Sequence, residues 1–194
     1  IIVGNSFGGA LALRAAAANS VAGVVLFAPF WRVDSWLEGL FPVAARAFPH
    51  IRPFARADFA DSRLRTELRH FLPDADLNDP AVQAGIRQLT LPTRALGQVR
   101  RAGQVGYDAA SAVSAPVLIF QGRRDPLVKL RLTRRLAHRL PNLAGYLEID
   151  GEHDLVRGIA PDWPVVVTML HRFVAQLATT QYPSAAKPQL HGCT

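Results

Sequence analysis

The N-terminal stretch IIVGNSFGGALAL places a serine among glycines where a strand pattern changes into a helix pattern. Apolar β-formers precede Ser6, and the Ala- and Leu-rich stretch GGALALRAAAANS follows it. The five residues Gly4-Asn5-Ser6-Phe7-Gly8 fit G-x-S-x-G. A serine on so tight a turn adopts a strained backbone, which is tolerable only if the residues two before and two after lack bulk. The pattern predicts that Ser6 is a nucleophile on a strand-to-helix elbow, with Gly4 and Gly8 as its elbow glycines.

The same turn aims the N-terminus of the following helix at Ser6. Free N–H groups and the helix dipole at this end stabilise a developing oxyanion. The sequence therefore predicts the backbone N–H of Phe7 as an oxyanion donor.

Further α/β units follow the elbow. The segments 21–30, 114–128 and 144–156 each contain an apolar strand pattern, continuous rather than alternating in the first two. Continuous hydrophobicity is typical of strands covered on both faces, as in a parallel sheet. Helix patterns over 129–140 and 162–177 follow the last two strands. We therefore predict an α/β fold with a parallel-sheet core formed by residues 1–30 and 114–178.

Residues 31–113 have a different character, with many prolines and bulky aromatic side chains. Asp79 before Pro80 predicts the start of a helix that continues through Val82, Ile86 and Leu89. A short helix is expected after Pro92. We predict an inserted helical cap whose aromatic residues form a small core, and we expect some of them also to line an acyl pocket. These aromatic residues are Trp31, Trp36, Phe41, Phe48, Phe54, Phe59 and Phe71.

Composition excludes several classes of function. The net charge of the chain is +7. The densest basic cluster, at 129–140, has leucines at every fourth position, so its arginines are interpreted as the solvated face of a helix, and no nucleic-acid partner is expected. No apolar run is long enough to span a membrane, and no stable membrane insertion is expected. The histidines show no metal-ligand spacing, so we expect neither a metal nor an organic cofactor. The single cysteine, Cys193, lies in a tail expected to be flexible (179–194) and fits a reducing, cytoplasmic location.

A nucleophilic serine needs a base, and the base needs an orienting carboxylate. Asp125 in GRRDPLV follows one apolar strand, and His153 in GEHDLV follows the next. Both lie where loops leave the carboxyl ends of strands, the edge at which open α/β sheets bind ligands. Ser6, Asp125 and His153 are therefore the predicted catalytic residues. Asp150, Asp154 or an acid on the cap are alternatives for the carboxylate.

With these motifs in this order, the chain resembles the α/β-hydrolase superfamily. GNSFGGALAL resembles the elbow of ester hydrolases and of carbon–carbon bond hydrolases that act on ring-fission products, whereas DGEHDLV is similar to the lysophospholipase, monoacylglycerol lipase and carboxylesterase branch. The resemblance implies a serine hydrolase that cleaves a small-molecule carboxylic ester with a hydrophobic acyl or alcohol part. Carbon–carbon bond hydrolysis, acyl transfer to another acceptor, and a non-catalytic ligand-binding receptor remain alternatives.

The family sheet begins with several strands before the elbow, and the loop after the third strand supplies the second oxyanion donor. Neither is found ahead of Ile2. We therefore expect the missing N-terminal half of the same polypeptide to be a partner of these residues. Without it the first strand would have a bare apolar edge, and the 194 residues alone are expected to be nearly inactive or prone to association.

Overall fold

The computed structural model describes residues 1–33, 45–72, 74–156 and 162–181. The chain divides into two compact units, one formed by Ile1–Ser35 with Arg100–Thr194 and the other by Trp36–Val99. The predicted cap aromatics Trp36 and Phe41 and the tail cysteine Cys193 lie outside the described residues. The assignment of residues 31–113 to an inserted helical cap stays a prediction, but Trp31, counted among the cap aromatics, is buried in the core of the first unit instead.

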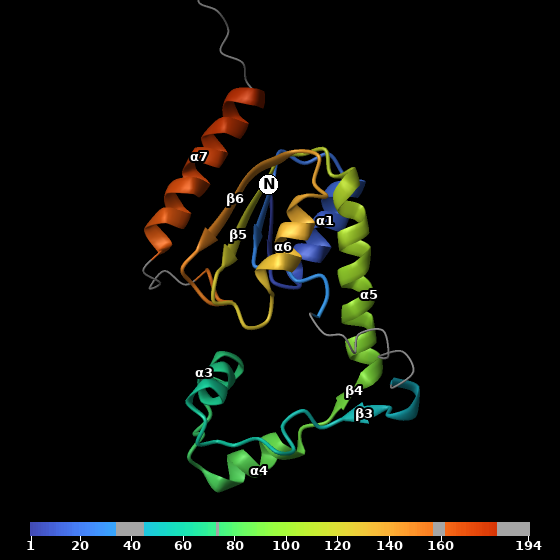
Figure 1. Cartoon of the computed structure of the whole chain (residues 1–194), viewed down its shortest axis with the longest axis vertical. Helices are drawn as coiled ribbons and strands as arrows, with labels where there is room; N and C mark the ends of the chain where they lie inside the picture. Colours follow the sequence, from blue (N-terminus) through green and yellow to red (C-terminus); the bar gives the residue numbers. More distant parts are fainter. Residues whose placement is uncertain (34–44, 73, 157–161, 182–194) are drawn as a thin grey trace, which may run out of the picture. The chain divides into compact units, whose positions relative to one another are not determined.

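The first unit contains a four-stranded parallel sheet (Figure 1). Its strands are β1 (Ile2–Asn5), β2 (Val24–Phe27), β5 (Val117–Gly122) and β6 (Leu143–Ile149), in the order β1-β2-β5-β6. The register pairs Val3 with Val25 and Leu26 with Ile119. The predicted α/β class with a parallel sheet is therefore confirmed.

Alternate residues of the two central strands enter two separate cores. Leu26 and Ile119 lie in a cluster with residues of α1 (Gly8–Ala18) and α6 (Leu130–Ala137). Phe27 and Phe120 lie in a second cluster with α7 (Trp163–Gln181), and their rings stack with centroids 5.1 Å apart. Figure 1 shows α7 on one side of the sheet and α1 and α6 on the other. The continuous apolar runs of β2 and β5 thus reflect burial on both faces.

The basic helix α6 has the arrangement expected from its sequence. Leu132 and Leu136 are buried against the sheet, and the arginines face outward. Arg134 forms a bidentate ion pair with Glu148 of β6, with N–O distances of 2.6 and 2.8 Å. The outward charge of this helix is thus balanced in part by an acidic residue of the neighbouring strand.

The second unit has a small core of its own, formed by Phe59, Leu68, Leu77 and Ile86. Its elements are the antiparallel pair β3 (His50–Ile51) and β4 (Leu91–Pro92), with helices α3 (Ser62–Phe71) and α4 (Pro80–Gln88). The predicted N-cap of α4 is confirmed, because Asp79 accepts a hydrogen bond of 2.7 Å from the N–H of Ala81.

Two details of the helix prediction are wrong. Helix α4 ends at Gln88, and Leu89, its C-cap residue, has a non-helical ψ of 124° and is 45% exposed. The helix after Pro92 is long rather than short: α5 spans Thr93–Ala109 and is followed by a 3₁₀ turn at Ala110–Ala112. Gly106 does not end this helix but allows close packing, since a Cβ there would lie 2.6 Å from Cα of Ala10.

Strand β1 lies at the edge of the sheet and pairs, among the described strands, with β2 alone. Ile1 and Val3 are 54% and 63% exposed, as expected for an apolar edge.

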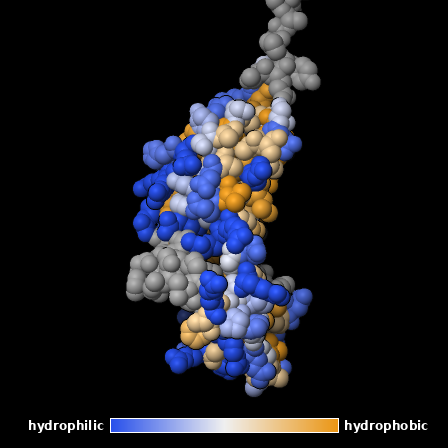
Figure 2. Space-filling model, turned by 90° about the vertical axis from the view of Figure 1, so that its right-hand side faces the viewer, coloured by the Kyte–Doolittle hydropathy of each residue, from blue (hydrophilic) through white to orange (hydrophobic). Residues whose placement is uncertain are grey.

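Figure 2 shows hydrophobic and hydrophilic side chains gathered in separate areas on one face of the molecule. Within the part of the chain that the structure describes, no helix is both long and apolar enough to cross a bilayer.

Candidate active site

Ser6 lies on a strained turn between β1 and α1. Its φ angle is +51°, in the left-handed region that residues other than glycine rarely adopt. Its N–H donates to the carbonyl of Phe27 at 2.8 Å, and its own carbonyl accepts from the N–H groups of Gly9 and Phe30 at 2.9 and 3.0 Å. These bonds hold the serine backbone against the end of β2, so the strain expected at the elbow is both present and sustained by its surroundings.

The elbow positions at which a side chain would clash differ from the predicted ones. A Cβ at Gly4 would lie 2.7 Å from both the Gly8 carbonyl oxygen and Cα of Gly9, so this position requires glycine. A Cβ at Gly8 would meet no atom within 4 Å among the described residues, so the expectation that Gly8 must lack bulk is wrong. Gly9 has the second steric role instead, because a Cβ there would lie 2.9 Å from Cβ of Pro29.

Phe7 occupies the N-cap position of α1, with φ −56° and ψ −33°. The N–H groups of Gly9 and Ala10 donate to the carbonyls of Ser6 and Phe7. Within the described chain the Phe7 N–H donates to no backbone carbonyl. It thus lies at a helix N-terminus as a free donor, the arrangement that suits an incoming oxyanion.

The structure brings the three predicted catalytic side chains together. Nε2 of His153 lies 2.8 Å from Oγ of Ser6, and its Nδ1 lies 2.8 Å from Oδ2 of Asp125. The His153 side chain is 20% exposed and that of Asp125 only 1%. The carboxylate is thus sheltered, while the imidazole retains contact with solvent beside the hydroxyl.

Contact between His153 and Ser6 depends on a loop that crosses the end of the sheet. Strands β1 and β6 are three positions apart in the sheet, and neighbouring strands are about 4.8 Å apart, so the two ends are separated by roughly 14 Å. The loop after β6 covers this distance by passing over the end of β5. A Cβ at Gly122 would overlap the carbonyl oxygen of Glu152 and lie 2.6 Å from that of Gly151. Gly122 therefore makes room for the loop that carries His153.

Asp125 accepts four hydrogen bonds. Its Oδ1 accepts from the N–H groups of Leu127 and Val128, both at 2.8 Å, and its Oδ2 accepts from His153 and from Nε2 of Gln121 at 3.0 Å. Burial by itself raises the pKa of this carboxyl group, but the hydrogen bonds from His153 and the two backbone N–H groups, with the attraction of the imidazolium, outweigh burial and lower the pKa. Asp125 is therefore ionised at neutral pH.

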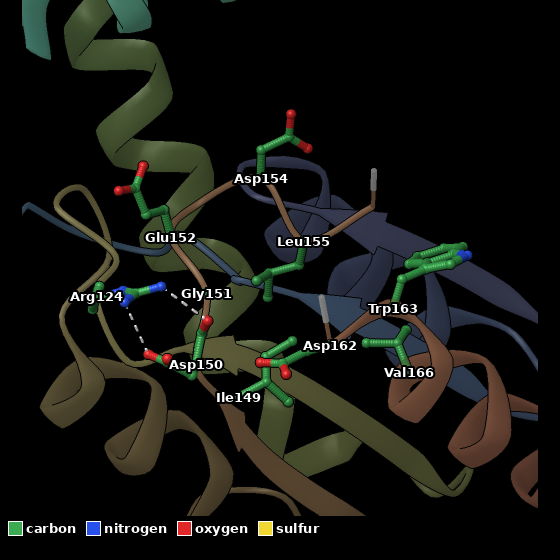
Figure 3. A pocket seen from close by; sticks show the side chains of 10 residues that line it. All are labelled: Arg124, Ile149, Asp150, Gly151, Glu152, Asp154, Leu155, Asp162, Trp163 and Val166. Atoms are coloured by element: carbon green, nitrogen blue, oxygen red, sulfur yellow. Dashed lines mark hydrogen bonds and ion pairs between the residues drawn. The ribbon is translucent and has the colours of Figure 1, made fainter. Parts of the chain in front are cut away.

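Asp125 provides the carboxylate oxygen that contacts Nδ1 of His153, whereas the alternative acid Asp150 has a different partner. Asp150 is paired with Arg124, whose Nη1 lies 3.4 Å from Oδ1 and whose Nη2 donates to the Asp150 carbonyl at 3.1 Å (Figure 3). Figure 3 also shows Asp154, which lies farther along the loop after β6 and lines a cavity of about 190 Å³. Neither Ser6 nor His153 lines that cavity, so it is separate from the serine site.

The sequence analysis missed two residues that support this arrangement, Gln121 and Thr133. Both are fully buried, and Thr133 Oγ1 donates to Oε1 of Gln121 at 2.7 Å. A signal was available: Gln121 is a polar residue directly after four apolar residues of a strand covered on both faces. A buried amide in such a strand requires partners nearby.

Comparisons with known proteins bear on the family and the fold of this chain. The model of the family described as serine aminopeptidase, S33, matches residues 1–157. The fold is similar to that of a monoacylglycerol lipase from Paleococcus ferrophilus, with 20% identity and a TM-score of 0.60 over 89% of this chain and 67% of that one. It is also similar to a soluble variant of monoglyceride lipase from Saccharomyces cerevisiae, with 15% identity and a TM-score of 0.59 over 90% and 61%.

A third structure, alpha/beta hydrolase domain-containing protein 10 from mouse, is 16% identical, with a TM-score of 0.56 over 90% of this chain and 61% of that one. This chain thus spans between 61% and 67% of the length of the three solved structures. A comparison with curated proteins finds no match. The family match over most of the sequence, on a parallel sheet with a serine at its first strand-to-helix turn, shows that the chain belongs to the α/β-hydrolases, in the family described as serine aminopeptidase, S33.

Proposed function

We propose that the protein containing this chain is a serine hydrolase that cleaves carboxylic esters through an acyl-enzyme on Ser6. The observation that carries the proposal is the unbroken series of contacts from Ser6 Oγ to His153 and from His153 to Asp125, each 2.8 Å long. A hydroxyl within hydrogen-bond distance of an imidazole that is itself held by a buried carboxylate is the arrangement that activates a serine.

In the proposed reaction, Nε2 of His153 takes the Ser6 proton as Oγ attacks the ester carbonyl carbon. Asp125 holds the Nδ1–H of the imidazole and balances its positive charge. The N–H of Phe7 donates to the oxyanion of the tetrahedral intermediate. The alcohol leaves with the proton from His153, and a water activated by the same nitrogen then releases the acid and restores Ser6.

A hydrophobic acyl or alcohol part is the proposed substrate feature. Two of the similar structures are lipases of monoacylglycerol or monoglyceride. The second unit also contains partly buried apolar and aromatic side chains, Phe54 among them, of the kind that line acyl pockets. We propose a monoacylglycerol or another ester with one long hydrocarbon chain as the substrate class.

A fluorophosphonate probe tests the proposal on the full-length protein. We expect covalent labelling of Ser6 in the wild type, none in Ser6→Ala, and unchanged labelling in Ser111→Ala, a matched control at an exposed serine. Labelling that persists in Ser6→Ala, or none in the wild type, would contradict the proposal and favour a ligand-binding receptor. For substrate class, hydrolysis of vinylogous diketone acids in preference to monoacylglycerols would favour carbon–carbon bond cleavage instead.

A further inference from the structure

Gln121 is a buried amide on the strand that leads to the Asp125 loop. It lies in β5 and is 0% exposed. Its neighbours in the strand are the core residue Phe120 and Gly122, which lies against the backbone of the His153 loop. A primary amide taken out of water here requires hydrogen bonds for both its oxygen and its nitrogen. The partners that it has lead directly to the candidate active site.

The surroundings fix the orientation of this amide. Nε2 faces three oxygens: the carbonyls of Gly122 and Val128 at 3.2 and 3.1 Å, and Oδ2 of Asp125 at 3.0 Å. Only the NH₂ end of the amide can donate, with its two hydrogens shared among these three acceptors, so the oxygen end must face Thr133. The Thr133 hydroxyl, also 0% exposed, then donates to Oε1 at 2.7 Å.

We propose that Gln121, held in place by Thr133, is a positioning residue for the Asp125–His153 pair. The hydrogen bonds form one series from Thr133 through Gln121 and Asp125 to His153 and Ser6. This role rests on the proposed function, because it acts on the carboxylate that orients the catalytic imidazole.

The two oxygens of Asp125 are fixed by different means. Backbone N–H groups of its own loop hold Oδ1, whereas Oδ2, the oxygen that contacts His153, is held by Gln121. Without this amide, Oδ2 keeps only the His153 donor, and only the two backbone bonds at Oδ1 and the His153 bond itself oppose rotation of the carboxylate about the Cβ–Cγ bond. The Nδ1–H of His153 would then lose a fixed acceptor, and with it the orientation of Nε2 toward Ser6.

Glutamate at position 121 gives a signature that a merely structural role would not produce. Burial and the neighbouring carboxylate would both raise the pKa of the new carboxyl group. While protonated, its O–H can donate to Oδ2 of Asp125, and its other oxygen can accept from Thr133. Once ionised, it presents a second negative charge and no donor. In Gln121→Glu, we therefore expect Ser6 labelling to fall with rising pH, over a range in which the wild type stays at its plateau.

Threonine variants test the other end of the series. Thr133→Val removes the hydroxyl and keeps the shape, and Thr133→Ser keeps the hydroxyl. We expect the labelling rate constant of Ser6 to fall by up to about tenfold in Thr133→Val, the equivalent of one neutral hydrogen bond, and to stay near wild type in Thr133→Ser. Thr93→Val is the matched control, since Thr93 is a buried threonine of the other unit that donates to the Pro49 carbonyl at 3.0 Å.

The experiment measures the rate constant for fluorophosphonate labelling of Ser6 against pH in the full-length protein and each variant. It also records the low-field NMR signal of His153 Nδ1–H, which requires no catalysis. An alkaline fall in Gln121→Glu together with a displaced Nδ1–H signal in Thr133→Val supports the proposal. An equal loss at every pH, or an unchanged signal in Thr133→Val, overturns it. A wild type that shows the signal but is not labelled refutes the proposed hydrolase and leaves the positioning role to be judged by the variants' signals.

Discussion

Replacing Gly122 by alanine should separate His153 from its partners without touching a catalytic side chain. No glycine in the described chain has a positive φ, so alanine meets no backbone penalty at this position. The penalty comes from space alone: the new Cβ would overlap the Glu152 carbonyl oxygen and lie 2.6 Å from that of Gly151. Both obstacles are backbone atoms of the loop that carries His153, and they cannot move aside as a side chain does.

The size of the effect follows from that geometry. Cβ atoms essentially never approach a neighbour closer than 3.0 Å, so the Gly151 oxygen must move by at least 0.4 Å (3.0 − 2.6), and the overlapping Glu152 oxygen by more. A displacement on the order of 1 Å at a catalytic group costs about 10²-fold in rate. Overpacking of this kind also lowers the free energy of unfolding by about 1–3 kcal/mol.

The assay compares Ser6 labelling rates and urea unfolding of Gly122→Ala with those of the wild type. Gly85→Ala is the control, because a Cβ on this residue of α4 would meet nothing within 4 Å among the described residues. We expect the control to keep the wild-type labelling rate and to gain about 0.4–1 kcal/mol of stability. Wild-type labelling and stability in Gly122→Ala would refute the conclusion that the His153 loop depends on close passage over β5.

Four further predictions concern the elbow and the carboxylate of Asp125. Gly4→Ala should destabilise the protein by about 1–3 kcal/mol in urea unfolding and Gly8→Ala should not, because only the first Cβ meets backbone atoms; equal losses would contradict this. Ser6→Gly should abolish labelling yet raise the free energy of unfolding by about 1 kcal/mol, since glycine relieves the +51° φ angle; Ser6→Ala, which keeps the strain, is the control. In Asp125→Asn the labelling rate should fall about 10⁴-fold, because the backbone donors at Oδ1 hold the amide oxygen and turn its NH₂ toward the His153 N–H. Because folding lowers the pKa of Asp125, the ionised carboxylate contributes its full stabilisation at a pH above 3.8, the usual pKa of the group. This stabilisation is lost as the pH falls through the folded-state pKa. The free energy of unfolding of the wild type should therefore decline below pH 3.8 by more than that of Asp125→Asn.

Local patterns in the sequence were enough to identify the elbow. The glycines around Ser6, the apolar strand before it and the helix formers after it are all short-range signals, and they predict a strained turn that the +51° φ angle confirms. The continuous apolar runs of β2 and β5 likewise predict burial on both faces, because side chains alternate along a strand whatever its neighbours are.

Local patterns failed where a packing partner determines the outcome. Gly8 fits the motif as well as Gly4, yet only Gly4 faces another backbone, and nothing in five residues distinguishes the two. The length of α5 was also missed: Gly106 lies within this helix, where it packs against Ala10, a residue far away in the chain.

By itself, the sequence determined that this is an α/β chain with a serine elbow, and it nominated Asp125 and His153 by their order after the later strands. Only the tertiary structure decided that these side chains meet, since the strand order places β6 three positions from β1 and a loop must cross β5 at Gly122. Only the tertiary structure likewise shows that Gln121 contacts Asp125 and that Thr133 contacts Gln121. Hydrogen bonds and steric contacts between residues distant in the chain depend on three-dimensional distance, which a linear pattern does not contain.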